Sequence, residues 1–281
     1  MALLRRRGYA LSPARLGAMC AGGALPEPEV RRAVAASPGL TIVRKLVVER
    51  EHMPRLDEIR VRADGHTAAS PDYLAMTLRF VHALVATAPF VHSVWIAGSL
   101  ASGGFRDSDD VDLNLVVDDG HRHLAYVAVN ALGLVHAMRH RGKPVDDLTR
   151  RPIAPRLMTA NLILERSELA PLARQDEGMA FELMVSQPLF GFDVFEQIVK
   201  VNPELTRHFP QLAGKTAPFA IAAPRTRLPR WLYPAMLDGA ARVFGSAAWR
   251  YMQWTRRHRP EALARVAFVR ETMRPYTLFD S

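Results

Sequence analysis

Two apolar runs, joined by a glycine-serine turn and a pair of acidic residues, constrain this chain more than any other feature. The first run, residues 94–97, leads into Gly98 and Ser99, and the second, residues 113–117, follows Asp110 and Asp112. Side chains alternate along a strand, so the two carboxylates are expected on one face. The segment therefore predicts a strand, a turn, a short helix or loop, and a second strand that opens with two acids.

These residue types point to nucleotide chemistry. Two neighbouring carboxylates repel and raise each other's pKa unless a cation lies between them. Mg²⁺ suits this place because it binds one or two carboxylates together with substrate phosphates. Gly98 allows close approach of the backbone to a phosphate, and Ser99 adds a hydroxyl and a backbone donor. We therefore expect Asp110 and Asp112 to hold metal, with Gly98 and Ser99 contacting phosphate.

This pattern resembles the signature of the nucleotidyltransferase superfamily typified by DNA polymerase β and the aminoglycoside nucleotidyltransferases. Gly98-Ser99, ten intervening residues and Asp110-Val111-Asp112 lie between apolar strands, as in that signature. The likeness is strong over residues 91–118 and weaker over 157–164 and 181–189, where the chain is similar to uncharacterised bacterial proteins with a nucleotidyltransferase domain. The resemblance implies an α+β fold with a polymerase β-like domain, a small mixed sheet covered by helices.

The resemblance also implies a reaction. An NTP, expected to be ATP, would give its NMP to an acceptor hydroxyl and release pyrophosphate, with one or two Mg²⁺ ions on Asp110 and Asp112. Gly98 and Ser99 would bind the β- and γ-phosphates. Arg106 would neutralise the leaving pyrophosphate or lie in solvent. The acceptor is a small molecule or RNA. The alternative is a catalytically degenerate protein on the same fold that binds nucleotide or nucleic acid.

A third carboxylate is the element of the implied site that the sequence does not clearly supply. In most catalysts of this superfamily it comes from a later strand and deprotonates the attacking hydroxyl, which is general-base work worth roughly 10²–10⁴-fold. The best later strand, residues 158–164, carries only Asn161 as a polar interior residue. Either Asp146 or Asp147 substitutes, the substrate brings its own base, or chemistry is slow or absent.

The rest of the chain divides by its patterns into three parts. Residues 1–68 predict a small helical or winged-helix-like module, in which 59–65 alternate like an exposed strand. Residues 69–215 form the expected catalytic domain, with a helix over 72–87 that starts at Ser70-Pro71-Asp72, a second over 121–139, and a helical pattern over 178–200. Residues 216–281 predict a basic helical region.

The C-terminal region carries much of the net charge of +9. From Arg225 onward there are eleven arginines against four acids. Such a segment can attract nucleotide, nucleic acid or an acidic surface, or it reflects a general preference for arginine. Aromatic residues alternate with these arginines and are able to stack on bases, but helical spacing favours packing in the core. They are Trp231, Tyr233, Phe244, Trp249, Tyr251 and Trp254.

The remaining features set the expected environment. No apolar run reaches about 18 residues, so no membrane partner is expected. Cys20 is the only cysteine, which excludes internal disulfides and favours a reducing cytoplasm. His136 and His140 have zinc-compatible spacing, but no acid or cysteine is placed to complete a site. The oligomeric state is left open.

Overall fold

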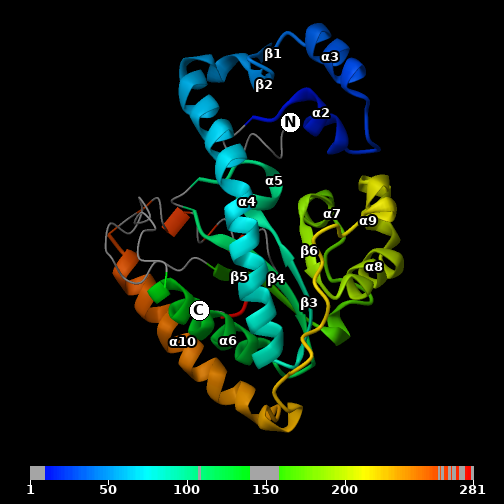
Figure 1. Ribbon diagram of the computed structural model, residues 1–281. Coiled ribbons are helices and arrows are strands. Elements are labelled where there is room, and N and C mark those ends of the chain that lie inside the picture. The colour runs from blue at the N-terminus through cyan, green and yellow to red at the C-terminus, as the bar shows by residue number, and fades with distance from the viewer. Residues whose placement is uncertain are drawn as a thin grey trace.

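The computed structural model of the protein (Figure 1) describes residues 10–106, 109–139 and 158–258, and further along the chain residues 260, 263, 264, 267, 270, 271 and 276–279. It is an α+β structure built on a mixed sheet, as the sequence predicts. Its strands are β1 (Leu40–Val43), β2 (Leu46–Glu49), β3 (Val91–Ile96), β4 (Val111–Val117), β5 (Met158–Glu165) and β6 (Gln187–Phe190). Its α-helices are α2 (Pro13–Ala18), α3 (Glu27–Ala36), α4 (Leu56–Thr87), α5 (Gly98–Ser102), α6 (Arg122–Arg139), α7 (Glu177–Val185), α8 (Phe192–Val201), α9 (Pro203–His208) and α10 (Met236–Arg256).

The main sheet has the strand order β5-β4-β3-β6. β4 runs parallel to β5 and antiparallel to β3, and β6 pairs antiparallel to the other side of β3. The predicted strand over 158–164 is confirmed as β5, and the predicted helix over 121–139 is confirmed as α6. Helix α6 makes the crossover between the two parallel strands, as a parallel pair requires.

Helices cover both faces of this sheet. On one face, Val111, Leu113 and Leu115 of β4 pack in a core with residues of α4 and α6. On the other, Trp95 and Val116 pack in a second core with residues of α7, α8 and α9. Figure 1 shows α4 and α6 on one side of the strands and α7–α9 on the other. β3 and β4 are therefore apolar on both faces, since both are buried.

The N-terminal part consists of α2, α3, the β1–β2 hairpin, the 3₁₀ helix η1 (Arg50–Arg55) and the start of α4. The hairpin turns through Arg44 and Lys45, both in the left-handed region of φ. A bridge between Leu11 and Val47 ties the chain ahead of α2 to the hairpin. The part is thus helical with a two-stranded hairpin, and the strands lie at residues 40–49.

The expected strand over 59–65 is wrong, because these residues belong to the 32-residue helix α4. Val61 is 65% exposed, and the less exposed positions follow a helical rather than an alternating pattern: Ile59, Arg60, Arg62, Ala63 and His66. Arg62 points inward, although its charge suggested an outward position. The expected helix start at Ser70-Pro71-Asp72 is also wrong, since Pro71 lies inside α4. The predicted boundary between residues 68 and 69 falls within this helix.

The helical pattern over 178–200 is divided into α7 and α8 by the edge strand β6. Pro188 is compatible with β6 because an edge strand leaves one side of its backbone unpaired. Gly191 then turns the chain with a positive φ, and a side chain there would overlap the carbonyl oxygen of His92. The apolar residues that suggested one helix thus belong to two helices and a strand, all packed on the sheet.

Helix α10 lies along the outside of α6 (Figure 1). The segment that leads to it is fastened by Arg227, which donates to the carbonyl oxygens of Val85, Pro89 and Val91. The expectation that the C-terminal aromatics form core is wrong for four of them, because Trp231, Phe244, Tyr251 and Trp254 are exposed. Within the described part of the chain, none of the helices has the length and apolarity needed to cross a membrane.

Candidate nucleotide site at the Gly98–Asp112 turn

The turn after β3 and the start of β4 meet as the sequence predicts. Ala97 N donates to Asp112 O at 2.9 Å, which closes the antiparallel pair at the turn. Gly98 has φ of +63°, and a Cβ atom at this residue would lie 2.8 Å from Cγ of Asp112 and overlap its Oδ2. Only glycine therefore allows the backbone to lie directly against the Asp112 carboxylate.

Ser99 and the loop that follows it are held by Asp109. Oδ2 of Asp109 accepts from Ser99 Oγ at 3.1 Å and from Arg106 N at 3.0 Å. One carboxylate thus joins the Gly-Ser turn to the loop before β4. Sequence reasoning missed this residue; its position directly before Asp110 was the available signal.

The two predicted metal ligands differ in their surroundings. Asp112 is half-buried on β4, where Oδ1 accepts a 3.3 Å hydrogen bond from Thr159 Oγ1 on β5. Asp110 precedes the strand and is exposed, as is Arg106. Asp146 and Asp147, the acids considered as a third carboxylate, lie outside the described residues.

Asn161 lies one step further along the sheet than Asp112. β5 has an irregularity at Asn161, so Leu113 pairs with Ala160 and Asn114 with Leu162. The Asn161 side chain donates to Asn114 Oδ1 at 3.0 Å, and Asn114 is buried. The residue beside Asp112 is therefore Thr159, and a pair of amides lies next to it.

Three side chains from the N-terminal part hold α5 and the loop that follows it. Arg15 on α2 donates to Ala101 O at 2.9 Å, and Arg62 on α4 donates to Gly104 O at 2.6 Å and lies 3.9 Å from Asp109. His66 on α4 accepts from Phe105 N at 3.2 Å. The conformation of the turn thus depends on residues far away in the sequence.

The environment of His66 favours its neutral form. The ring is buried, and burial together with the nearby Arg15 and Arg62 guanidinium groups lowers the pKa of His66 to about 4. A neutral ring has a lone pair on Nδ1, which is what an acceptor for Phe105 N requires. The protonation state and the hydrogen bond therefore support each other.

Metal ligation can be tested against the arrangement of the described acids and histidines. Among these residues, one group of three places its ligand atoms within 4.8 Å of one another, and it comprises Glu49, Glu51 and His52 at the end of the hairpin. His52 Nδ1 lies 3.3 Å from Glu49 and Nε2 lies 4.0 Å from Glu51, so contacts with the imidazole ring account for this group. Within the described chain, Asp110 and Asp112 belong to no such trio.

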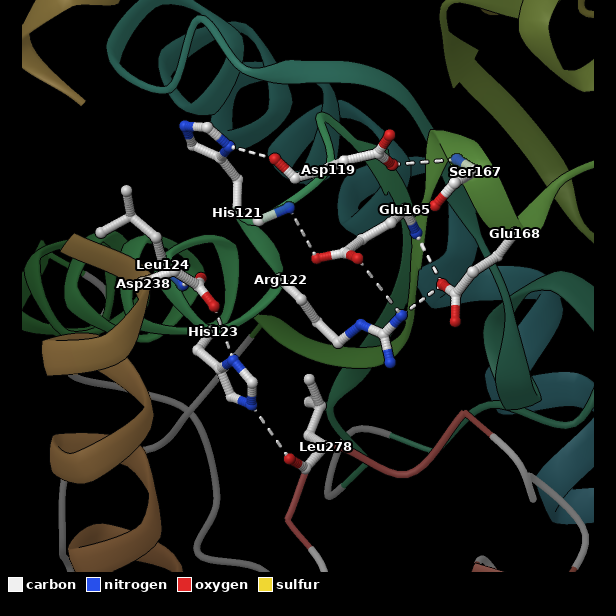
Figure 2. Close-up of polar contacts among 11 residues, drawn as sticks. Asp119, His121, Arg122, His123, Leu124, Glu165, Ser167, Glu168, Asp238 and Leu278 are labelled. Atoms are coloured by element: carbon white, nitrogen blue, oxygen red, sulfur yellow. Dashed lines mark hydrogen bonds and ion pairs between the residues drawn. The ribbon is translucent and has the colours of Figure 1, made fainter. Parts of the chain in front are cut away.

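A second polar cluster lies at the opposite end of β4 and β5 (Figure 2). His123 contacts Asp238 at 2.7 Å, and Leu124 N donates to the same carboxylate at 2.7 Å. Burial opposes ionisation of Asp238, but these hydrogen bonds outweigh it and lower its pKa. Arg122 pairs with Glu165 and Glu168 on the neighbouring segment. This cluster attaches α10 to α6 and β5.

Comparison of the chain with protein-family models, with curated proteins and with solved structures finds no match in any of the three. The function must therefore be argued from the residues of the site.

Proposed function

We propose that this protein is a Mg²⁺-dependent nucleotidyltransferase that moves an NMP from an NTP to an acceptor hydroxyl and releases pyrophosphate. The observation that carries the proposal is the direct packing of the Gly98 backbone against the Asp112 carboxylate. It brings a phosphate-compatible turn and an acidic residue into one place, on two antiparallel strands. The polymerase β-like character of the domain is part of the same proposal.

The donor atoms of the site suit Mg²⁺. Asp110, Asp112 and Thr159 offer carboxylate and hydroxyl oxygens, which hard cations prefer. Asp110 and Asp112 would hold the ion, which when bound neutralises triphosphate charge and polarises the phosphorus that is attacked. Thr159 orients the Asp112 carboxylate by its hydrogen bond.

The residues around the ion would position the nucleotide. Gly98 and Ser99 would contact the β- and γ-phosphates, with the turn kept in shape by Asp109, Arg15, Arg62 and His66. The exposed Arg106 side chain would pair with the leaving pyrophosphate. Because these groups are arranged before substrate binds, they would add little ordering cost in the transition state.

A second candidate function is binding without catalysis. It is favoured by the amide pair Asn114–Asn161, which lies where the superfamily resemblance calls for an acid on a later strand. It is also favoured because Asp110 and Asp112 gain no third acidic or histidine ligand among the described residues. In this case the site would hold an NTP and leave it intact.

Pyrophosphate release from each NTP with Mg²⁺, in cell extract as the source of acceptor, separates the two functions. The variants are Asp112→Asn and, as a matched control, Asp72→Asn, which changes an exposed aspartate of α4. The proposal expects release by wild type and Asp72→Asn but not by Asp112→Asn. NTP binding without release by any of the three proteins would instead support the binding function.

A further inference from the structure

The outer face of α10 is an exposed apolar surface. Its large side chains are 56–81% exposed, although a helix in a globular protein usually turns such residues inward. At 100° per residue they fall on one side of the helix, with Ala240 and Ala247 between them. We call this surface the outer face of α10, and it consists of Met236, Val243, Phe244, Tyr251 and Trp254.

The opposite side of α10 is already used for packing. Asp238 is held by His123 and Leu124 of α6, and Ala241 is buried. Gly245 lies so close to the Phe279 ring that a side chain there would overlap it. These attachments set the rotation of the helix, so α10 cannot turn its apolar side inward without breaking them.

The segment that carries the outer face is strongly cationic. Residues 217–258 contain seven arginines and a single acid, Asp238, which is turned inward. Arg242 and Arg250 of α10, and Arg257 directly after it, are exposed. The outer face is therefore apolar, with arginines along one of its edges and no carboxylate among its own residues.

We propose that the outer face of α10 binds the surface of an anionic lipid bilayer. An in-plane helix of this kind buries apolar and aromatic side chains at the boundary between headgroups and acyl chains, while arginines contact anionic headgroups. Trp231, 77% exposed just ahead of α10, adds a residue type favoured at that boundary. This contact needs no spanning helix and is independent of the nucleotide chemistry.

Two other occupants fit the surface less well. A second copy of the chain would bring arginines against arginines, because the outer face offers no acid to pair with them. Single-stranded RNA would need free aromatic planes, but the Trp254 ring is stacked with Tyr251 at 6.1 Å between ring centres, and the Arg257 guanidinium lies 4.6 Å from its ring centre. Met236 and Val243 also offer nothing to bases or phosphates beyond apolar contact, although they are 81% and 70% exposed.

The test measures partition of the full-length protein onto vesicles of phosphatidylcholine mixed with phosphatidylglycerol and onto vesicles of phosphatidylcholine alone. Val243→Asp is compared with Val61→Asp, since both valines are exposed on helices, at 70% and 65%. We expect the wild type to bind the anionic vesicles. Val243→Asp should lower the partition coefficient about tenfold or more, and Val61→Asp should leave it unchanged. Arg250→Gln should weaken the binding about fivefold.

Three results would overturn the proposal. One is wild-type protein that binds neither kind of vesicle while circular dichroism shows it folded. Another is equal vesicle binding by Val243→Asp and Val61→Asp. The third is a wild-type protein that does not bind vesicles but forms a concentration-dependent dimer, or binds RNA, in a way that Val243→Asp abolishes. Such a result would assign the outer face of α10 to a second copy of the chain or to RNA.

Discussion

The backbone of Gly98 lies directly against the carboxylate of Asp112, with no room for a side chain between them. The turn after β3 and the acid on β4 therefore form one unit, in which a displacement of either residue moves the other. In the proposed reaction this unit places the triphosphate relative to the metal.

Replacement of Gly98 by alanine should damage the site more than the fold. The new Cβ would overlap Asp112 Oδ2, and the positive φ disfavours alanine. We expect nucleotidyl transfer to fall about 10²-fold, because small misplacements of reacting groups have effects of this size. Gly65→Ala is the control: it lies in α4 with open space around it, and should stabilise the protein by up to about 1 kcal/mol with activity unchanged. Equal activity of the two variants would contradict this view of the turn.

Asp109 should act as a positioning residue. In Asp109→Ala the hydrogen bonds from Ser99 Oγ and Arg106 N to Asp109 Oδ2 are lost, so the loop is no longer held in one conformation. We expect an about tenfold or larger rise in KM for the NTP, with the melting temperature within about 2 °C of wild type. Asp72→Ala should change neither. A lower kcat with unchanged KM would mean that Asp109 acts in the chemical step instead.

A carboxylate introduced beside Asp112 should make stability depend on Mg²⁺. In Thr159→Asp two acids would face each other across β4 and β5, and their repulsion should destabilise the protein by about 1–2 kcal/mol without metal. Added Mg²⁺ should reverse the loss, since ion binding favours the folded state. Asn161→Asp, next to Asn114, is the comparison and should respond less to Mg²⁺. The measurement is thermal unfolding with Mg²⁺ or EDTA, and identical responses of both variants would argue against a cation at Asp112.

The low pKa of His66 predicts a loss of stability in weak acid. Unfolded histidine titrates near 6.5 and folded His66 near 4, so the unfolded chain binds more protons between these values. The buried neutral ring makes its full contribution to the free energy of unfolding above about pH 6.5. This contribution declines by up to about 3 kcal/mol as the pH falls towards 4. His66→Asn, which keeps an acceptor for Phe105 N but does not titrate, should flatten this part of the profile. Urea unfolding of both proteins across this range tests it, and parallel profiles would contradict the assignment.

Structural features could be predicted from the sequence where the residues that determine them are close together in the chain. The turn at Gly98, the strand after Asp110 and helix α6 follow from neighbouring residues, and the structure has them as predicted. Arg62 and His66 could not be recognised in this way. Their role depends on the packing of α4 beside a loop about forty residues later, and Arg62 seemed to belong to an exposed strand.

The aromatic residues of α10 were predicted wrongly for a different reason. Their spacing places them on one face of the helix, as is typical of residues packed in a core. The inward side of α10 is instead formed by Asp238, Ala241 and Gly245. The contact between Asp238 and His123 joins segments more than a hundred residues apart, so the rotation of α10 was not predictable from its own sequence. The structure does not test whether Asp146 or Asp147 supplies the third carboxylate, because both lie outside the described residues.

The most direct test of the central claim follows the α-phosphate. Wild type, Asp110→Asn/Asp112→Asn and Asp72→Asn are incubated with Mg²⁺ and cell extract, with NTP labelled at either the α- or the γ-phosphorus. A nucleotidyltransferase transfers the α-label to an acceptor and releases the γ-label in pyrophosphate, and the double variant should do neither. Transfer of the γ-label, or α-label transfer that persists in the double variant, would contradict the account.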